Sequence, residues 1–102
     1  METQVSLNEG QAVMKLAGRF DFNAHREYRA ALDRLVALVG VDAYVVDLAE
    51  VSYLDSSALG MLLLLRDRAR QQNKPVTLAG VSGSVRQVLD IANFSKMFAI
   101  TA

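Results

Sequence analysis

The sequence predicts an α/β domain built on a mostly parallel sheet, for three reasons. Short runs of β-branched and aliphatic residues alternate with segments whose apolar residues have helical spacing. The first two apolar runs are joined by the turn tripeptide Asn8-Glu9-Gly10, which indicates an antiparallel hairpin. Each later strand is separated from the next by a helix. This alternation implies that consecutive strands are parallel and joined by right-handed crossovers. We therefore expect a mostly parallel central sheet, opened by an antiparallel hairpin, with helices packed against it.

The first half of the chain contains the hairpin and one helix. The hairpin strands are expected over residues 3–7 and 12–16. Asn23 is a suitable N-cap for a helix over residues 24–39, in which apolar residues recur on one face. Gly40 follows that segment, as glycine commonly does after the last turn of a helix.

The second half begins with a buried strand that contains Val45 and Val46 and is expected to end near Asp47-Leu48. A helix should then start at Ser56-Ser57, because a serine oxygen accepts hydrogen bonds from the unpaired N–H groups of a first turn. It should end before Pro75. The remaining expected elements are a strand over 76–79, a helix from Ser82 to about Ala92 and a last short strand over 98–101.

The helix that starts at the two serines has two distinct faces, because each residue turns the helix by about 100°. The stripe assigned to the core contains Ala58, Leu62, Leu65 and Ala69. The opposite face contains Ser56, Gly60, Leu63 and Asp67, with Leu64 at its margin. The two leucines on this side are not needed to anchor the helix. Three explanations remain open: another element covers them, they are scattered exposed leucines without significance, or they belong to a partner-binding face.

Composition limits the possible functions. With 102 residues, 52% hydrophobic and 22% charged, the chain fits a single globular domain over residues 1–102. Eleven basic residues balance eleven acidic ones, so no direct nucleic-acid partner is expected. There is no cysteine, and the amino-terminal residues do not resemble a signal peptide. The longest apolar run, over residues 58–65, is far shorter than the roughly 20 residues that cross a bilayer. We expect a cytoplasmic protein without membrane insertion.

Catalytic chemistry is hard to find, so no enzyme, cofactor or metal is expected. The single histidine, His25, lies at a polar helix start, and no G-x-S-x-G elbow is present. The segment over residues 80–84 resembles a phosphate-binding loop only loosely, because the lysine of a P-loop is missing. A magnesium site is conceivable, and its candidate ligands are Asp21, Asp47, Glu50 and Asp55. Roles in caps, turns and solvated loops explain these acidic residues more simply.

Residues 51–60, Val-Ser-Tyr-Leu-Asp-Ser-Ser-Ala-Leu-Gly, resemble the signature of the STAS family, the bacterial anti-sigma factor antagonists, or anti-anti-sigma factors. The resemblance extends over nearly the whole chain and includes Gly18, Asp21 and residues 91–98. Ala58 stands where glycine is usual, a change that a helix start tolerates well. The resemblance implies a single STAS-type domain and a role in signal transduction and transcription regulation.

In that family the first serine after the aspartate is phosphorylated, which implies Ser56 as the phosphorylation site and makes Ser57 the less favoured neighbour. The implied mechanism is partner switching. The unphosphorylated protein binds an anti-sigma factor that is also its serine kinase and thereby frees a sigma factor. Phosphorylation abolishes this binding, and a PP2C-like serine phosphatase restores it.

The expected partner-binding residues are Asp21, Asp55, Ser56, Ser57, Gly60, Leu63, Leu64 and Asp67. Three alternatives remain open. In the first, the protein is a non-phosphorylated STAS subunit of a lipid-transporting ABC transporter, in which the same helix face is a permanent interface. In the second, Ser56 is only an N-cap. In the third and least favoured, the domain binds or hydrolyses a nucleotide.

Overall fold

The computed structural model describes residues 1–102. Its first two strands are joined by a two-residue turn at Glu9-Gly10. β1 (Glu2–Asn8) and β2 (Gln11–Phe20) pair antiparallel around this turn. Both turn residues have a positive φ, 49° at Glu9 and 84° at Gly10. This is the geometry of a type I′ turn, whose twist matches that of the flanking strands. The predicted hairpin is confirmed.

Helices and parallel strands alternate along the rest of the chain. The elements are η1 (a 3₁₀ turn, Phe22–Ala24), α1 (His25–Val36), β3 (Ala43–Leu54), α2 (Ser56–Gln71), β4 (Val76–Ala79), α3 (Gly83–Ile91), η2 (a 3₁₀ turn, Phe94–Lys96) and β5 (Ala99–Ile100). The sheet order is β1-β2-β3-β4-β5, and every pair after the hairpin is parallel. The predicted fold class is therefore confirmed.

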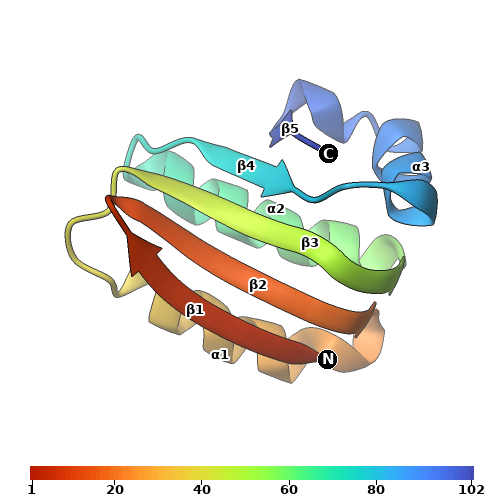
Figure 1. The fold of residues 1–102 in the computed structure, drawn as a ribbon, viewed down its shortest axis with the longest axis horizontal. Coiled ribbons are helices and arrows are strands. Elements are labelled where there is room, and N and C mark those ends of the chain that lie inside the picture. Colours follow the sequence, from red (N-terminus) through yellow and green to blue (C-terminus); the bar gives the residue numbers. More distant parts are fainter.

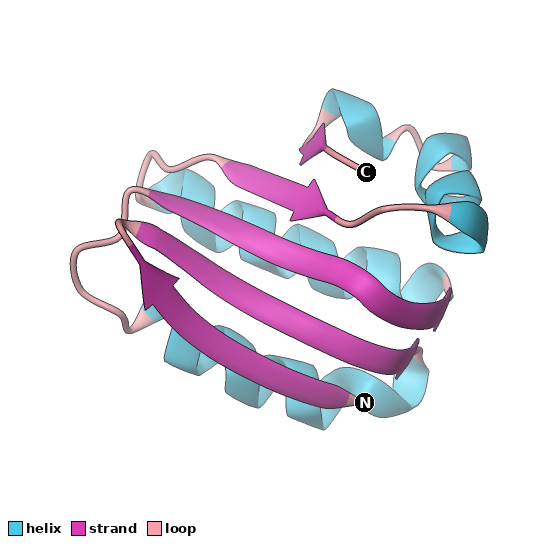
Figure 2. Cartoon of the chain, in the orientation of Figure 1, coloured by secondary structure: helices cyan, strands magenta, loops and turns pink.

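Helices α1 and α2 lie against one face of the sheet, and no helix covers the opposite face (Figure 1). Figure 2 shows the same two layers, with α3 and η2 beyond the β4 side of the sheet. Alternate residues of β2, namely Ala12, Met14 and Leu16, are fully buried beneath the helices. The core contains no charged side chain, so the charged residues are confined to the loops, the outer helix surfaces and the open face of the sheet.

The first helix differs from its prediction at both ends. Asp21, not Asn23, is the first cap: its carboxylate accepts a hydrogen bond from the Asn23 N–H and starts η1, from which α1 continues. The helix ends at Val36, so Gly40 lies four residues beyond it, and Val39 is 88% exposed. Apolar spacing alone does not separate a helical residue from a loop residue that happens to keep the same period.

β3 is longer than predicted and continues past Asp47-Leu48 to Leu54. Its second half pairs only with β2, and the register between the two strands shifts twice. Such irregularities are typical of β-bulges, which interrupt the alternation of buried and exposed residues. Ala49 and Glu50 are both exposed, and this break makes the strand resemble a loop in the sequence.

The other sequence-based expectations agree more closely with the structure. The core stripe of α2 is confirmed, because Ala58, Leu62, Leu65 and Ala69 are fully buried. Ser82 precedes α3 as its N-cap but makes no capping hydrogen bond with its side chain. None of the helices combines the length and the apolar content that a membrane crossing requires.

Candidate functional site

The loops that follow β2 and β3 start next to each other. The last residues of these strands, Phe20 and Leu54, are register partners, and the Asp55 N–H donates to the Phe20 carbonyl oxygen at 3.3 Å. The carboxyl ends of parallel strands meet at one edge of a sheet, and binding sites are common there. The fold thus brings Asp21 and the Asp55-Ser56 pair to the same edge.

Asp55 connects these two loops through both of its carboxylate oxygens. Oδ1 accepts from the Ala58 N–H at 3.0 Å and caps α2, while Oδ2 accepts from the Phe22 N–H at 3.3 Å. The prediction that Ser56 caps the helix is wrong, because Asp55 is the N-cap. A carboxylate suits this position, since its charge also interacts favourably with the helix dipole.

Ser56 is the first residue of α2 and is exposed. Its hydroxyl makes no hydrogen bond to another protein group, and the backbone N–H groups of Ser56 and Ser57 also have no partner in the protein. Ser57 is half-buried. The amino end of α2 therefore presents one free hydroxyl beside two unpaired N–H donors, an arrangement that favours a negatively charged group.

The outer face of α2 exposes less apolar surface than expected. Gly60 and Asp67 are exposed, as the helical geometry predicts. Leu63, however, is half-buried and packs against the core, whereas Leu64 is 37% exposed. The two leucines are thus only partly available to a partner.

Exposed aromatic residues at the same edge were missed by the sequence analysis. Phe22 is 68% exposed and meets His25 edge-to-face at 5.7 Å between ring centroids. Tyr53 is 41% exposed, and the guanidinium of Arg19 lies 4.2 Å from its ring centroid. The sequence did contain a signal for these aromatic residues. Phe22 directly follows Asp21, and Tyr53 lies three positions before Ser56.

Asp21 is already occupied by local contacts. Its Oδ2 is 3.4 Å from the Arg19 Nε, and its Oδ1 accepts from the Asn23 N–H at 3.0 Å. The positive charge of Arg19 offsets the charge of this carboxylate. Asp21 therefore supports the loop, and any like-charge effect on a group at Ser56 is reduced.

The carboxylates considered as magnesium ligands each have partners of their own. Glu50 pairs with Lys15 at 2.6 Å, and the Asp47 carboxylate accepts from the Ala49 N–H at 3.0 Å. No three acidic or histidine side chains are grouped closely enough to hold a metal ion.

The glycine-containing turn after β4 has a structural explanation. Gly80 has a φ of +68°, and a Cβ at this position would lie 2.8 Å from the Cβ and the backbone nitrogen of Ala49. Glycine is required here because the turn passes close to β3.

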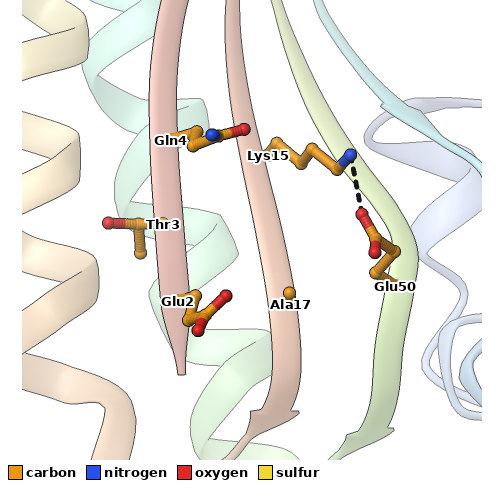
Figure 3. A pocket seen from close by; sticks show the side chains of 6 residues that line it. All are labelled: Glu2, Thr3, Gln4, Lys15, Ala17 and Glu50. Carbon is orange, nitrogen blue, oxygen red and sulfur yellow. Dashed lines mark ion pairs between the residues drawn. The ribbon is translucent and has the colours of Figure 1, made fainter.

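A pocket on the open face of the sheet is shown in Figure 3. Its volume is about 500 Å³, and it is lined by Glu2, Thr3, Gln4, Lys15, Ala17 and Glu50. The hydrogen bond and charge of Glu50 raise the pKa of Lys15. None of these lining residues belongs to the predicted partner-binding set, so the pocket is separate from the amino end of α2.

The chain is similar to known proteins over nearly its whole length. A family model described as "Mlab, STAS domain" matches residues 3–100. A STAS-domain containing protein of Pseudomonas aeruginosa (strain UCBPP-PA14) is 48% identical over 94 residues, which cover 91% of each chain. The chain therefore belongs to the STAS domain family, as the sequence motif indicated.

Solved structures share this fold at low sequence identity. An anti-sigma factor antagonist from Mycobacterium paratuberculosis has a TM-score of 0.86 at 21% identity, over 98% of this chain and 84% of the other. The antagonist SpoIIAA gives 0.74 at 20% identity in its unphosphorylated form, over 99% and 88% of the two chains. Its phosphorylated form, from Bacillus, gives 0.72 at 19% identity, over 99% and 92%.

Proposed function

We propose that this protein is an anti-sigma factor antagonist that works by partner switching and is controlled by phosphorylation of Ser56. In this role it is a binding protein and not an enzyme. Its unphosphorylated form binds an anti-sigma factor that is also its serine kinase, and so frees a sigma factor. A PP2C-like phosphatase reverses the modification.

The observation that carries the proposal is the free hydroxyl of Ser56. Asp55 already caps α2, so the serine side chain has no capping role in the fold. An exposed residue without a structural contact is accessible to a kinase and leaves the fold intact when it is modified. SpoIIAA, which shares the fold, has been solved both with and without phosphate, which supports this role for the present chain.

Electrostatics explains how the modification acts differently on the fold and on the complex. A phosphoserine adds about −1.5 to −2 charges near neutral pH. At the start of α2 the two unpaired N–H groups and the helix dipole favour that charge by roughly 0.3–1 kcal/mol. The domain should therefore stay folded after phosphorylation.

The complex would not tolerate the same charge. Phe22, Tyr53 and Leu64 expose apolar surface at the sheet edge that also carries Ser56 and along the adjoining helix. A partner covering this surface would remove water from the phosphate, at a cost of several kcal/mol unless it supplies a counter-charge. Because about 1.4 kcal/mol changes affinity tenfold, this cost is enough to dissociate the complex.

The test is capture of partners from the native cell by tagged Ser56→Ala and Ser56→Asp variants. Ser56→Ala should retain an anti-sigma factor with kinase activity, and Ser56→Asp should lose it while keeping its melting temperature. Ser84→Asp is the matched control, because Ser84 is also an exposed serine in the first turn of a helix. Intact-mass spectrometry with fragmentation should assign the phosphate to Ser56 in wild-type protein.

Two results would count against this role. One is a Ser56→Asp variant that retains its partners as well as wild type does. The other is co-purification of an ATPase with membrane components regardless of the residue at position 56. The second result would indicate the alternative role as a permanent STAS subunit of a lipid-transporting ABC transporter.

A further inference from the structure

A second surface pocket lies near the carboxyl end of α2, at the far end of the helix from Ser56. At about 1.5 Å per residue, Arg70 lies about 21 Å along the helix axis from Ser56. The pocket has a volume of about 340 Å³ and is lined by Arg66, Arg70, Lys74, Pro75, Val76 and Met97. It does not share a residue with the edge that carries Ser56.

Its charged residues are all basic. Arg66, Arg70 and Lys74 supply three positive charges, and no acidic residue lines the pocket. The ion pairs of the structure involve other residues, so none of these three cations is neutralised by a carboxylate. Like charges gathered in one pocket repel each other, and a bound anion would relieve that repulsion.

Backbone contacts fix two of the cations in place. The Arg66 Nε donates to the Met97 carbonyl oxygen at 3.1 Å, and the Lys74 ammonium group donates to the Val41 carbonyl oxygen. The terminal nitrogens of Arg66 make no hydrogen bond to the protein. Arg66 is therefore held through one nitrogen while its two terminal amino groups stay available, the fork that binds phosphate oxygens in a bidentate manner.

Stabilisation of the helix dipole does not account for this arrangement. Basic residues are favoured in the last turn of a helix, and Arg68 and Arg70 both satisfy that preference. Arg68, however, is two positions from Arg70 and points to a different side of the helix, outside the pocket. The dipole explains why basic residues occur here but not why three of them line the same pocket.

We propose that this pocket binds a phosphate-bearing ligand, independently of the role of Ser56. Its size accommodates one or two phosphate groups, and it lies at the low end of the range for small-molecule sites. Pro75, Val76 and Met97 form an apolar wall beside the cations. Of these three, Pro75 is exposed and Met97 is half-buried, whereas Val76 is buried and forms the floor of the wall. The source of the phosphate is either a free small molecule or a phospholipid headgroup.

The experiment titrates the full chain with sodium pyrophosphate and follows the amide NMR spectrum. Shifts should concentrate at the pocket residues. Arg70→Gln should weaken binding about tenfold, the size expected for one charge-assisted contact. This variant tests binding without disturbing the fold, because the Arg70 side chain is exposed and makes no hydrogen bond to the protein. Arg68→Gln is the matched control on the same helix and should change affinity less than about twofold.

Two further arms identify the ligand. Co-sedimentation with phosphatidylcholine vesicles, with and without phosphatidylglycerol, tests the headgroup source, and polyglutamate tests whether carboxylates bind equally well. Pyrophosphate binding that depends on Arg70 supports a free phosphate ligand, and Arg70-dependent binding to anionic vesicles alone supports a headgroup. Absence of both, equal losses in Arg68→Gln and Arg70→Gln, or equally tight binding of polyglutamate would overturn the proposal.

Discussion

The carboxylate of Asp55 accepts a hydrogen bond from the backbone N–H of Phe22, a residue 33 positions earlier in the chain, at 3.3 Å. Its other oxygen caps α2 at 3.0 Å. One side chain therefore fixes the start of a helix and the position of a neighbouring loop. This relationship explains why the backbone of Phe22 lies next to Asp55, the residue before the two serines, although the two are far apart in sequence.

Replacing Asp55 with alanine should lower the free energy of unfolding by about 1–2 kcal/mol, because the capping hydrogen bond from Ala58 and the hydrogen bond from Phe22 are both lost. Urea denaturation followed by circular dichroism measures the change. Asp67→Ala, on the exposed side of the same helix, and Ser56→Ala should each stay within about 0.5 kcal/mol of wild type. A larger loss for Ser56→Ala than for Asp55→Ala would contradict the assignment of the cap.

Gly80 and Gly60 should respond in opposite directions to alanine. Gly80→Ala places a Cβ at 2.8 Å from Ala49 on a backbone with φ of +68°, so we expect a loss of about 1–3 kcal/mol. Gly60 lies inside α2 with open space around the added methyl group, so alanine should stabilise the protein by about 0.5–1 kcal/mol. Thermal and urea denaturation of the two variants, made in the same background, provide the comparison.

Tyr28 should make the protein less stable at high pH. Its hydroxyl is buried without a hydrogen-bond partner, and burial raises its pKa well above the ordinary value of 10.0. Above pH 10 the unfolded chain loses this proton while the folded chain keeps it. The free energy of unfolding therefore falls as pH rises, by up to about 1.4 kcal/mol per pH unit from this group.

Tyr28→Phe removes both the unpaired hydroxyl and its titration, and it keeps the ring that stacks on Phe20 at 5.3 Å. We expect a gain of about 1 kcal/mol below pH 10, because an unsatisfied buried group is lost. The difference from wild type should stay constant below pH 10 and grow above it. A difference that does not change between pH 9 and pH 11 would refute the burial effect.

Phe22 should contribute to partner binding without contributing to stability. Exposed aromatic residues supply a large share of the energy at protein interfaces. The Phe22 residue is 68% exposed. The Phe22→Ser variant should therefore weaken capture of the partner at least about tenfold and leave the melting temperature nearly unchanged. Val39→Ser is the control, since Val39 is 88% exposed and lies in the loop at the opposite edge of the sheet. Equal effects of the two substitutions would indicate non-specific binding.

Residue patterns predicted the architecture because each element is encoded locally. The turn at Glu9-Gly10 and the buried stripe from Ala58 to Ala69 depend only on neighbours in the sequence, and both are confirmed. The ends of elements depend on competition between adjacent groups. In the structure the cap is Asp21 where Asn23 was predicted, and Asp55 where Ser56 was predicted. In each case the aspartate carboxylate accepts the hydrogen bond from a free N–H group of the first turn.

The candidate site was predicted only in part for the same reason. The motif identified Ser56, whose exposure is a local property of a helix start. It did not reveal that Leu63 packs against the core or that Phe22 and Tyr53 are exposed nearby. Those properties depend on which strands pair and on how far β3 extends, and this information is distributed over the whole sheet.

The division of labour between two adjacent residues has a consequence for how position 56 can vary. Because the Asp55 carboxylate makes the capping hydrogen bond of α2, the Ser56 side chain is not needed to stabilise the start of the helix. Serine and threonine can occupy that place with nearly equal stability of the fold, and an acidic residue gains roughly 0.3–1 kcal/mol from the helix dipole. The modified and unmodified proteins would then share one backbone, and discrimination between them would rest entirely with the molecule that docks on them.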